Sequence, residues 1–434
     1  MKHEHHAGRF APVSYFKSVV PKGQVQFSGI ELFFWAAYAA SAFTAAYLQE
    51  KGYSASVVGL IMALVNCIGI VAAPMMGSLS DRLSSSRRVF LLCIAVSSVL
   101  YCVVPFIPGT NAVAVVATTV ALLAWAFFKN PTSSLLDGWL VRTVARRRTF
   151  RYGAVRLLGS IGYATMCIIF GRIAAALGTQ KYSFFFYGIL NIPLILLCVF
   201  GMDDERADEE SMRREKAEKQ AAQKDDGKKK KGKSPLAVAL KGYYFRMFLF
   251  SHALLGLTLY CMTTFLPYKL TEIAGNANSM GTVIAMKSYM EIPTFLFGAA
   301  IMKRLNVKQL FPICAGVFFF EQFVCLVASQ TWMVAISLML HGFTYGMYLT
   351  CMVNYVYRVT PAEAANSAMT IAGSLQLGVS VVGSLIGGVL VDRFGSAGYY
   401  AFSMTMQLIA LAIFLVTYPL GRKLGHAEPD LSDL

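Results

Sequence analysis

The sequence GSLSDRLSSSRRVF occupies residues 77–90 and lies between two long apolar runs. It places an Asp-Arg pair, Asp81 and Arg82, and an Arg-Arg pair, Arg87 and Arg88, on one short connection. Basic side chains gather in this way at the ends of helices that cross a lipid bilayer, and they bias that end toward the cytoplasm. The segment therefore indicates a protein that spans a membrane.

The composition of the whole chain agrees with this interpretation. Of 434 residues, 56% are hydrophobic and 14% are charged, whereas soluble domains carry about 25% charged residues. A helix must cross about 30 Å of hydrocarbon and satisfy its own backbone there. No run shows the alternation of an outer-membrane strand. The sequence predicts an all-α membrane protein with twelve transmembrane helices in two six-helix halves, at approximately 26–49, 56–80, 88–107, 112–140, 152–178, 182–201, 242–270, 279–302, 308–328, 331–357, 366–391 and 397–421.

Lys and Arg are distributed unevenly over the connections between these runs. If the N-terminus is cytoplasmic, the cytoplasmic segments hold 30 of them and the outer connections hold four. The positive-inside rule then places both termini in the cytoplasm, which we expect of a multi-pass protein of the cell membrane. Residues 202–241 carry both signs of charge and few large apolar residues, so they cannot fold alone. We expect an N-terminal tail at 1–25, a bundle at 26–201, the linker at 202–241, a second bundle at 242–421 and a tail at 422–434.

Several function classes are not expected from this sequence. The net charge of +16 follows from the topology, with anionic lipid as its natural neighbour, so no nucleic-acid partner is predicted. The nine cysteines lie in apolar runs without a Cys-x-x-Cys pair, and no metal site or cofactor is expected. The chain has no phosphate-binding loop for ATP and no nucleophile–base or His/Asp metal motif. We therefore expect no enzyme, and we expect a monomer.

Two six-helix halves joined by a charged cytoplasmic linker resemble the major facilitator superfamily. The opening segment matches its signature Gly-x-x-x-Asp-Arg-x-x-x-x-Arg-Arg, which the resemblance implies is a conformational latch made of Gly77, Asp81, Arg82, Arg87 and Arg88. The glycine would allow close helix approach, and the aspartate would cap a helix end or pair with an arginine of the other half. Alternatively, the arginines only enforce topology. The second half has Met302 in place of the aspartate.

Four further segments resemble one branch of this superfamily. They are NPTSSLLDGWL (130–140), YGAVRLLGSIGYA (152–164), MEIPTFLFG (290–298) and LHGFTYGMYLTCMVNYVYRVTPAE (340–363). The branch contains lactose permease, oligosaccharide–proton symporters, phenylpropionate permease and nucleoside permeases. The resemblance implies a secondary active transporter for proton-coupled uptake of a small organic solute, such as a sugar, nucleoside or aromatic acid. The alternative is proton-antiport efflux of drugs or metabolites, but the fifth predicted helix lacks the proline of the exporter signature.

Two charges inside the predicted spans lie at the same depth. Asp137 precedes the edge residue Arg142 by five positions, and Arg156 follows the edge residue Arg151 by five. Both therefore lie about 7 Å inside the membrane on antiparallel helices and can form a charge-assisted pair. The resemblance implies that they match the carboxylate and arginine that bind sugar hydroxyls in lactose permease. A purely structural salt bridge is the alternative.

A second group of titratable residues lies about 18–20 Å from the cytoplasmic edge, near the middle of the membrane. This depth suits a cavity between two halves of a transporter. Lys287 is four residues before Glu291 and could neutralise it. The group consists of Lys129, His252, Glu291, Glu321 and His341. The predicted substrate-binding residues are Asp137, Arg156, Lys129, Tyr38, Trp125 and His341.

The proton site departs from the lactose permease pattern. Thr344 stands where that family member has its proton-accepting glutamate, and Gln322 stands at or near the place of its arginine. The predicted proton-coupling residues are therefore Glu321, Glu291 and His341. Glu321 has no charged residue three or four positions away on its own helix. We expect it to be unpaired and to be the group that takes up the proton.

Overall fold

The computed structural model describes residues 22–146, 152–200, 209–210, 212–214, 217, 240–259, 261–302, 305–361 and 364–429. Over these residues the regular structure is helical throughout. The first half contains α2 (Lys22–Ala39), η1 (Ala40–Phe43), α3 (Thr44–Glu50), α4 (Ala55–Leu83), α5 (Ser86–Val103), η2 (Val104–Phe106), α6 (Ala112–Lys129), α7 (Thr132–Arg146), α8 (Tyr152–Leu177) and α9 (Tyr182–Phe200). The second half contains α12 (Tyr243–Leu259), α13 (Met262–Ala274), α14 (Met280–Met302), α15 (Val307–Val327), α16 (Thr331–Val359) and α17 (Ala365–Lys423).

The prediction of an all-α membrane fold is confirmed. Within the described ranges, nine helices are long and apolar enough to cross a bilayer, or ten if the bent pair α12 and α13 is one span. The helix α17 covers both of the last two predicted spans and turns at Gly395, where φ is 67° and ψ is −173°. Together with α14, this arrangement is consistent with the twelve predicted spans.

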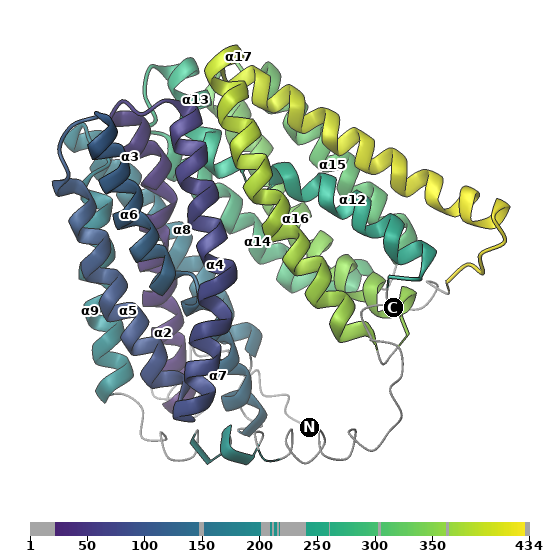
Figure 1. Ribbon diagram of the computed structural model, residues 1–434, viewed down its shortest axis with the longest axis horizontal. Helices are drawn as coiled ribbons and strands as arrows, with labels where there is room; N and C mark the ends of the chain where they lie inside the picture. Colours follow the sequence, from purple (N-terminus) through teal and green to yellow (C-terminus); the bar gives the residue numbers. More distant parts are fainter. Residues whose placement is uncertain are drawn as a thin grey trace, which may run out of the picture.

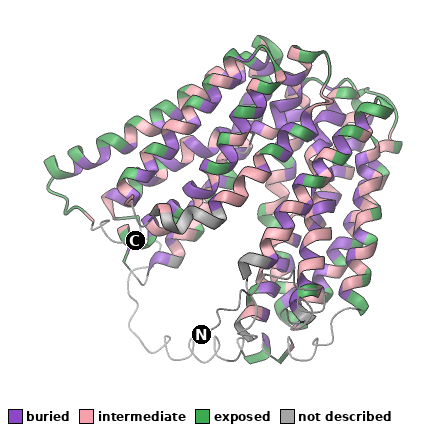
Figure 2. Ribbon diagram, turned by 180° about the vertical axis from the view of Figure 1, so that it is seen from behind, coloured by how far each residue is buried: buried purple, intermediate pink, exposed green. Residues whose placement is uncertain are grey.

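The outward side chains of these helices suit a lipid environment. Each bundle carries exposed residues on its outside and buried residues between its helices (Figure 2). Large apolar side chains such as Val99, Val113 and Phe250 are exposed. A contiguous apolar exterior of this kind marks a surface that contacts something other than water.

The two bundles meet closely at one end (Figure 1). Glycines permit this contact, because small residues let helix backbones approach. A Cβ atom at Gly281 of α14 would lie 2.1 Å from the carbonyl oxygen of Cys167 in α8. A Cβ atom at Gly388 of α17 would lie 2.6 Å from the carbonyl oxygen of Ala55 in α4. Both helix pairs therefore join the halves through backbone contact.

Hydrogen bonds also join the two halves at this end. The Asp392 carboxylate accepts hydrogen bonds from the backbone N–H groups of Ala55 at 2.7 Å and Ser56 at 2.8 Å. Those groups belong to the N-terminus of α4, which favours a negative charge. At the opposite end, where α9 ends and α12 begins, the bundles lean apart (Figure 1).

Candidate functional site

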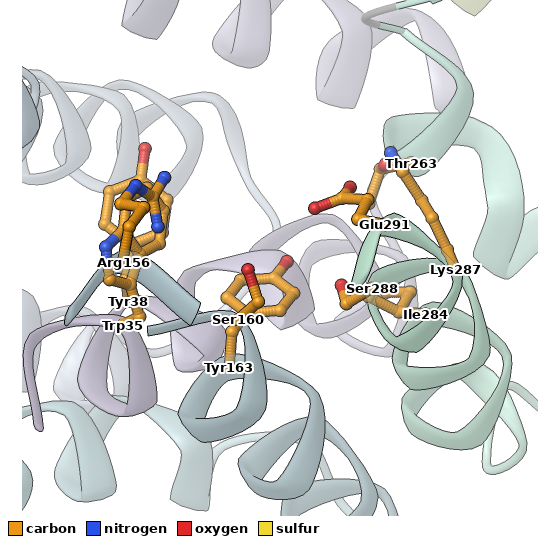
Figure 3. Close-up of a pocket in the computed structure, with 10 residues that line it drawn as sticks. All are labelled: Trp35, Tyr38, Arg156, Ser160, Tyr163, Thr263, Ile284, Lys287, Ser288 and Glu291. Atoms are coloured by element: carbon orange, nitrogen blue, oxygen red, sulfur yellow. The ribbon is translucent and has the colours of Figure 1, made fainter. Parts of the chain in front are cut away.

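A cavity of about 350 Å³ lies between the two halves (Figure 3). The first half lines it with Trp35, Tyr38, Arg156, Ser160 and Tyr163, and the second half lines it with Thr263, Ile284, Lys287, Ser288 and Glu291. Because both bundles contribute equally, any motion of one half against the other changes the cavity. The Glu291 carboxylate points from α14 into the space that faces the Arg156 side (Figure 3).

The helical period explains why these residues share the cavity. Side chains three, four and seven positions apart lie on one helix face. Three such faces converge, namely Trp35 and Tyr38 on α2, Arg156, Ser160 and Tyr163 on α8, and Ile284, Lys287, Ser288 and Glu291 on α14. The spacing from Arg156 and Glu291 could have identified Ser160 and Ser288 from the sequence. Thr263 follows the break between α12 and α13, so helical spacing could not have identified it from the sequence.

The predicted pair Asp137 and Arg156 is brought together by α7 and α8. Arg156 Nε lies 3.9 Å from Asp137 Oδ1, and Arg156 Nη1 lies 4.0 Å from Glu31 Oε2. Direct charge-assisted hydrogen bonds are about 2.7–2.9 Å long. The guanidinium is thus held between two carboxylates without a close bond to either, which leaves room for an oxygen atom of a ligand.

Glu31 is the residue of this cluster that the sequence did not single out. Its side chain is fully buried, and its Oε2 accepts a hydrogen bond from Trp35 Nε1 at 2.8 Å. The Arg156 guanidinium carbon lies 4.3 Å from the centre of the Trp35 ring. Trp35 therefore supports the arginine by a cation–π contact and orients the carboxylate behind it.

Gly159 allows this cluster to form. A Cβ atom at this position would lie 2.5 Å from Trp35 Cδ1 and 3.0 Å from Glu31 Oε2. The glycine one helical turn from Arg156 thus lets α8 approach α2 closely, and the side chains of α2 fill the space that a larger residue would need.

Two other predicted substrate-binding residues lie behind the cavity wall. Lys129 is buried, and its Nζ lies 3.7 Å from the centre of the Tyr38 ring. Trp125 is buried in the first half and stacks on Tyr101, with ring centres 4.4 Å apart. The structure therefore places Tyr38 at the cavity, Lys129 against its ring and Trp125 in the core.

Glu321 and His341 form a buried pair in the second half. Glu321 Oε1 lies 2.7 Å from His341 Nδ1 and 3.2 Å from Gln322 Nε2. The expectation that Glu321 is unpaired is wrong, because its partner comes from the next helix, α16, and not from its own. His341 does not line the cavity. His252 is also internal, with its Nε2 atom 3.2 Å from the carbonyl oxygen of Ala372.

The structure describes the surroundings of the predicted latch residues in part. A Cβ atom at Gly77 would meet nothing within 4 Å, so no helix of the described ranges packs closely against this glycine. The Asp81 side chain is exposed. Arg87 donates to the carbonyl oxygen of Val199 at 3.0 Å, and Arg88 pairs with Glu209 at 2.8 Å. The latch therefore stays a prediction.

Comparison with known proteins identifies the family. The model described as the MFS_1 like family matches residues 25–402. The chain belongs to this family. It is 20% identical to the uncharacterized transporter YwbF of Bacillus subtilis over 380 residues, which cover 83% of this chain and 86% of YwbF. It is 23% identical to the putative nucleoside transporter YegT of Escherichia coli over 421 residues, which cover 90% of this chain and 91% of YegT.

Solved structures share the fold of this MFS_1-like protein. The nucleoside transporter NupG superimposes with a TM-score of 0.71 at 12% identity, covering 92% of this chain and 98% of NupG. The D-xylose-proton symporter superimposes with a TM-score of 0.66 at 14% identity, covering 92% of this chain and 97% of the symporter. The family match and the apolar helices make this MFS_1-like protein a multi-pass membrane transporter of the major facilitator superfamily, and not an enzyme.

Proposed function

We propose that this MFS_1-like protein is a secondary active transporter that takes up a small hydroxylated solute, a sugar or a nucleoside, together with protons. The observation that carries this proposal is the cavity to which both halves contribute ionisable side chains. Arg156 comes from the first half, and Lys287 and Glu291 come from the second. A site shared by two bundles that can rock against each other is the arrangement that alternating access requires.

The chemistry of the cavity favours a neutral ligand with many hydroxyl groups. Cationic side chains donate hydrogen bonds, carboxylates accept them, and a hydroxyl group can do both. Arg156, Lys287 and Glu291 line the cavity. The carboxylates of Asp137 and Glu31 lie within 4.0 Å of Arg156, so the site has no excess of positive charge. The rings of Trp35, Tyr38 and Tyr163 add flat apolar surface against which a sugar or a base can lie.

The relatives support the same solute classes. The names of YegT and NupG refer to nucleosides, and the neighbouring symporter carries xylose with protons. An aromatic acid remains the third class that the resemblance implies. An acid would need an excess of cations, and the balance of charges around the cavity favours the neutral solutes.

We infer that the bundles open toward the cytoplasm of the cell. The support is the excess of Lys and Arg in the sequence on the connections at the end where α9 ends and α12 begins. A protease site inserted near Gly227, which lies outside the described residues, should be cut only by protease on the cytoplasmic face. Cleavage by protease outside intact cells would contradict the inferred orientation.

We infer that the buried pair of Glu321 and His341 carries the coupled proton. Glu321 Oε2 makes no hydrogen bond among the described residues, so the carboxyl group has an oxygen free to hold a proton. A carboxylate without full compensation is costly inside the membrane, which makes such a residue a candidate for function. Glu291, which faces the cavity, is the second candidate.

Uptake by purified protein in sealed proteoliposomes tests the proposal. Radiolabelled xylose, maltose, uridine, adenosine and phenylpropionate should be offered with and without an inside-alkaline pH gradient. We expect one of the sugars or nucleosides to accumulate, and its accumulation to require the gradient. Uptake of that solute without any response to the gradient would refute proton coupling. Gradient-driven expulsion of a solute from the vesicles would instead favour the efflux alternative.

A further inference from the structure

A second cavity lies far from the solute site, where α15 begins and α17 ends. Its volume is about 310 Å³, and it is lined by Lys308, Phe414, Leu415, Tyr418, Pro419 and Arg422. The two cations lie at the ends of their helices, while Phe414, Leu415 and Pro419 lie further along the span. Ends of membrane spans are the level of lipid headgroups, and the residues further in face the acyl chains.

The two cations already hold an anion, which is a carboxylate of the same chain. Glu428 Oε1 contacts Lys308 Nζ, and Glu428 Oε2 lies 2.8 Å from Arg422 Nε and 2.7 Å from Arg422 Nη2. These hydrogen bonds hold the pKa of the Glu428 carboxyl below its usual range. Two guanidinium donors thus converge on one oxygen, and an ammonium group contacts the other. The oxygens of a phosphate group can accept from the same set of cationic donors.

The segment that carries Glu428 is anchored through His426. The His426 ring stacks on Tyr243, with ring centres 4.6 Å apart, and the His426 backbone N–H donates to the carbonyl oxygen of Gly421 at 3.0 Å. The Lys308 and Arg422 side chains are 36% and 64% exposed, so an external anion can reach both without any change in the helices. The Glu428 carboxylate is therefore an exchangeable occupant of the site.

We propose that Lys308 and Arg422 form a binding site for the phosphate group of an anionic phospholipid, and that Glu428 occupies the phosphate position when the lipid is absent. A lipid is favoured over free phosphate because the cations adjoin an apolar surface. Leu415 is 54% exposed within this surface. An acyl chain would cover it, while inorganic phosphate would leave it bare. Basic pockets between transmembrane helices bind lipid headgroups by this combination.

Native mass spectrometry of the full-length protein in detergent tests the site. The lipids are phosphatidylglycerol and phosphatidylcholine, with inorganic phosphate as a third addition. Glu428→Gln should increase phosphatidylglycerol binding, because it removes the competing charge. The double variant Lys308→Gln/Arg422→Gln should reduce that binding by more than about tenfold, since each cation near an anionic lipid contributes about fivefold.

Lys423→Gln is the matched control, because it removes one exposed cation from the same helix end outside the cavity. It should change phosphatidylglycerol binding far less than the single variant Arg422→Gln. Equal losses in these two variants would indicate unspecific attraction and overturn the site.

Unchanged binding in Glu428→Gln would overturn the role of the tail. Phosphatidylcholine bound as well as phosphatidylglycerol, or full displacement by inorganic phosphate, would overturn the choice of an anionic lipid. Glu428→Gln is expected to increase phosphatidylglycerol binding. Misfolding of the double variant therefore cannot explain every result that supports the site.

Discussion

At Arg156 the guanidinium group lies between Asp137 and Glu31 at distances too long for direct hydrogen bonds. Such a group can turn its planar fork toward a ligand and still remain charge-compensated. Replacement by lysine keeps the charge but removes the fork. A lost hydrogen bond to a charged group costs about 1.5–3 kcal/mol.

We therefore predict that Arg156→Lys weakens solute binding by about 30-fold, which corresponds to about 2 kcal/mol, while the protein still folds. Equilibrium binding of the transported solute measures this effect. Arg172→Lys is the control, because Arg172 lies on the same helix with an exposed side chain outside the cavity lining. Normal binding by Arg156→Lys would make Arg156 a structural residue.

Glu321 differs from Arg156 because it lies outside the cavity, where it contacts His341. Glutamine keeps the size and a carbonyl oxygen for His341, but it cannot take up a proton. We predict that Glu321→Gln loses uphill accumulation while downhill exchange continues. Uptake in proteoliposomes with and without a pH gradient separates the two activities.

Glu291→Gln provides the comparison for this variant. Glu291 faces the cavity, so its loss should weaken binding and reduce both uphill and downhill transport. If Glu321→Gln still accumulates solute against its gradient, the proton is carried elsewhere. Glu291 would then be the candidate for the coupled proton.

The sequence identified those residues whose position follows from depth along a helix. Asp137 and Arg156 lie equally far from basic edge residues, and the structure brings them together. Depth alone does not give the rotation of one helix about its axis relative to another. For this reason the sequence missed Glu31 as a neighbour of Arg156 and His341 as the partner of Glu321.

At the scale of elements, the contact of α2 with α8 depends on Gly159. We predict that Gly159→Ala lowers stability by about 1–3 kcal/mol, the usual cost of overpacking, and reduces solute binding because Trp35 and Glu31 must move. Thermal unfolding and binding of the purified protein measure both effects. Gly316→Ala on α15 is the control, because an added Cβ meets nothing within 4 Å there.

The control should gain up to about 1 kcal/mol, since alanine favours helix over glycine. If both variants behave alike, the glycine is dispensable for the contact of α2 and α8. The sequence could not have distinguished these two glycines, because both lie inside apolar runs. Only the neighbouring helix decides which one must remain small.

The helix boundaries that the sequence predicts are those set by local properties of the chain. Most predicted spans begin and end near the observed helices, because hydropathy and charge are local properties. The 42° bend between α12 and α13 was not predicted, since residues 242–270 read as one apolar run. The turn at Gly395 lies between the last two predicted spans, where its positive φ suits glycine.

At the scale of the whole molecule, the two ends differ. One end is joined by backbone contacts and by the Asp392 carboxylate on the N-terminus of α4, and at the other end the bundles lean apart (Figure 1). A transporter that alternates between two states must break the contacts at the first end to bring the bundles together at the other. Asp392 is therefore placed to stabilise the state seen here.

We predict that Asp392→Asn shifts the population toward the state that opens at the Asp392 end. A charge at a helix N-terminus contributes about 0.3–2 kcal/mol, so the ratio of the two states should change by about 2- to 30-fold. Electron paramagnetic resonance between spin labels at positions 110 and 276, one in each half at this end, should show an increased fraction of long distances. The matched control is Glu272→Gln, since Glu272 accepts a hydrogen bond from the Ser396 N–H at 2.7 Å within the second half. It removes the same charge near the same end without breaking a contact between the halves, so its distances should stay short. If the two variants give the same distances, Asp392 acts through general charge and the cap on α4 does not control the conformation.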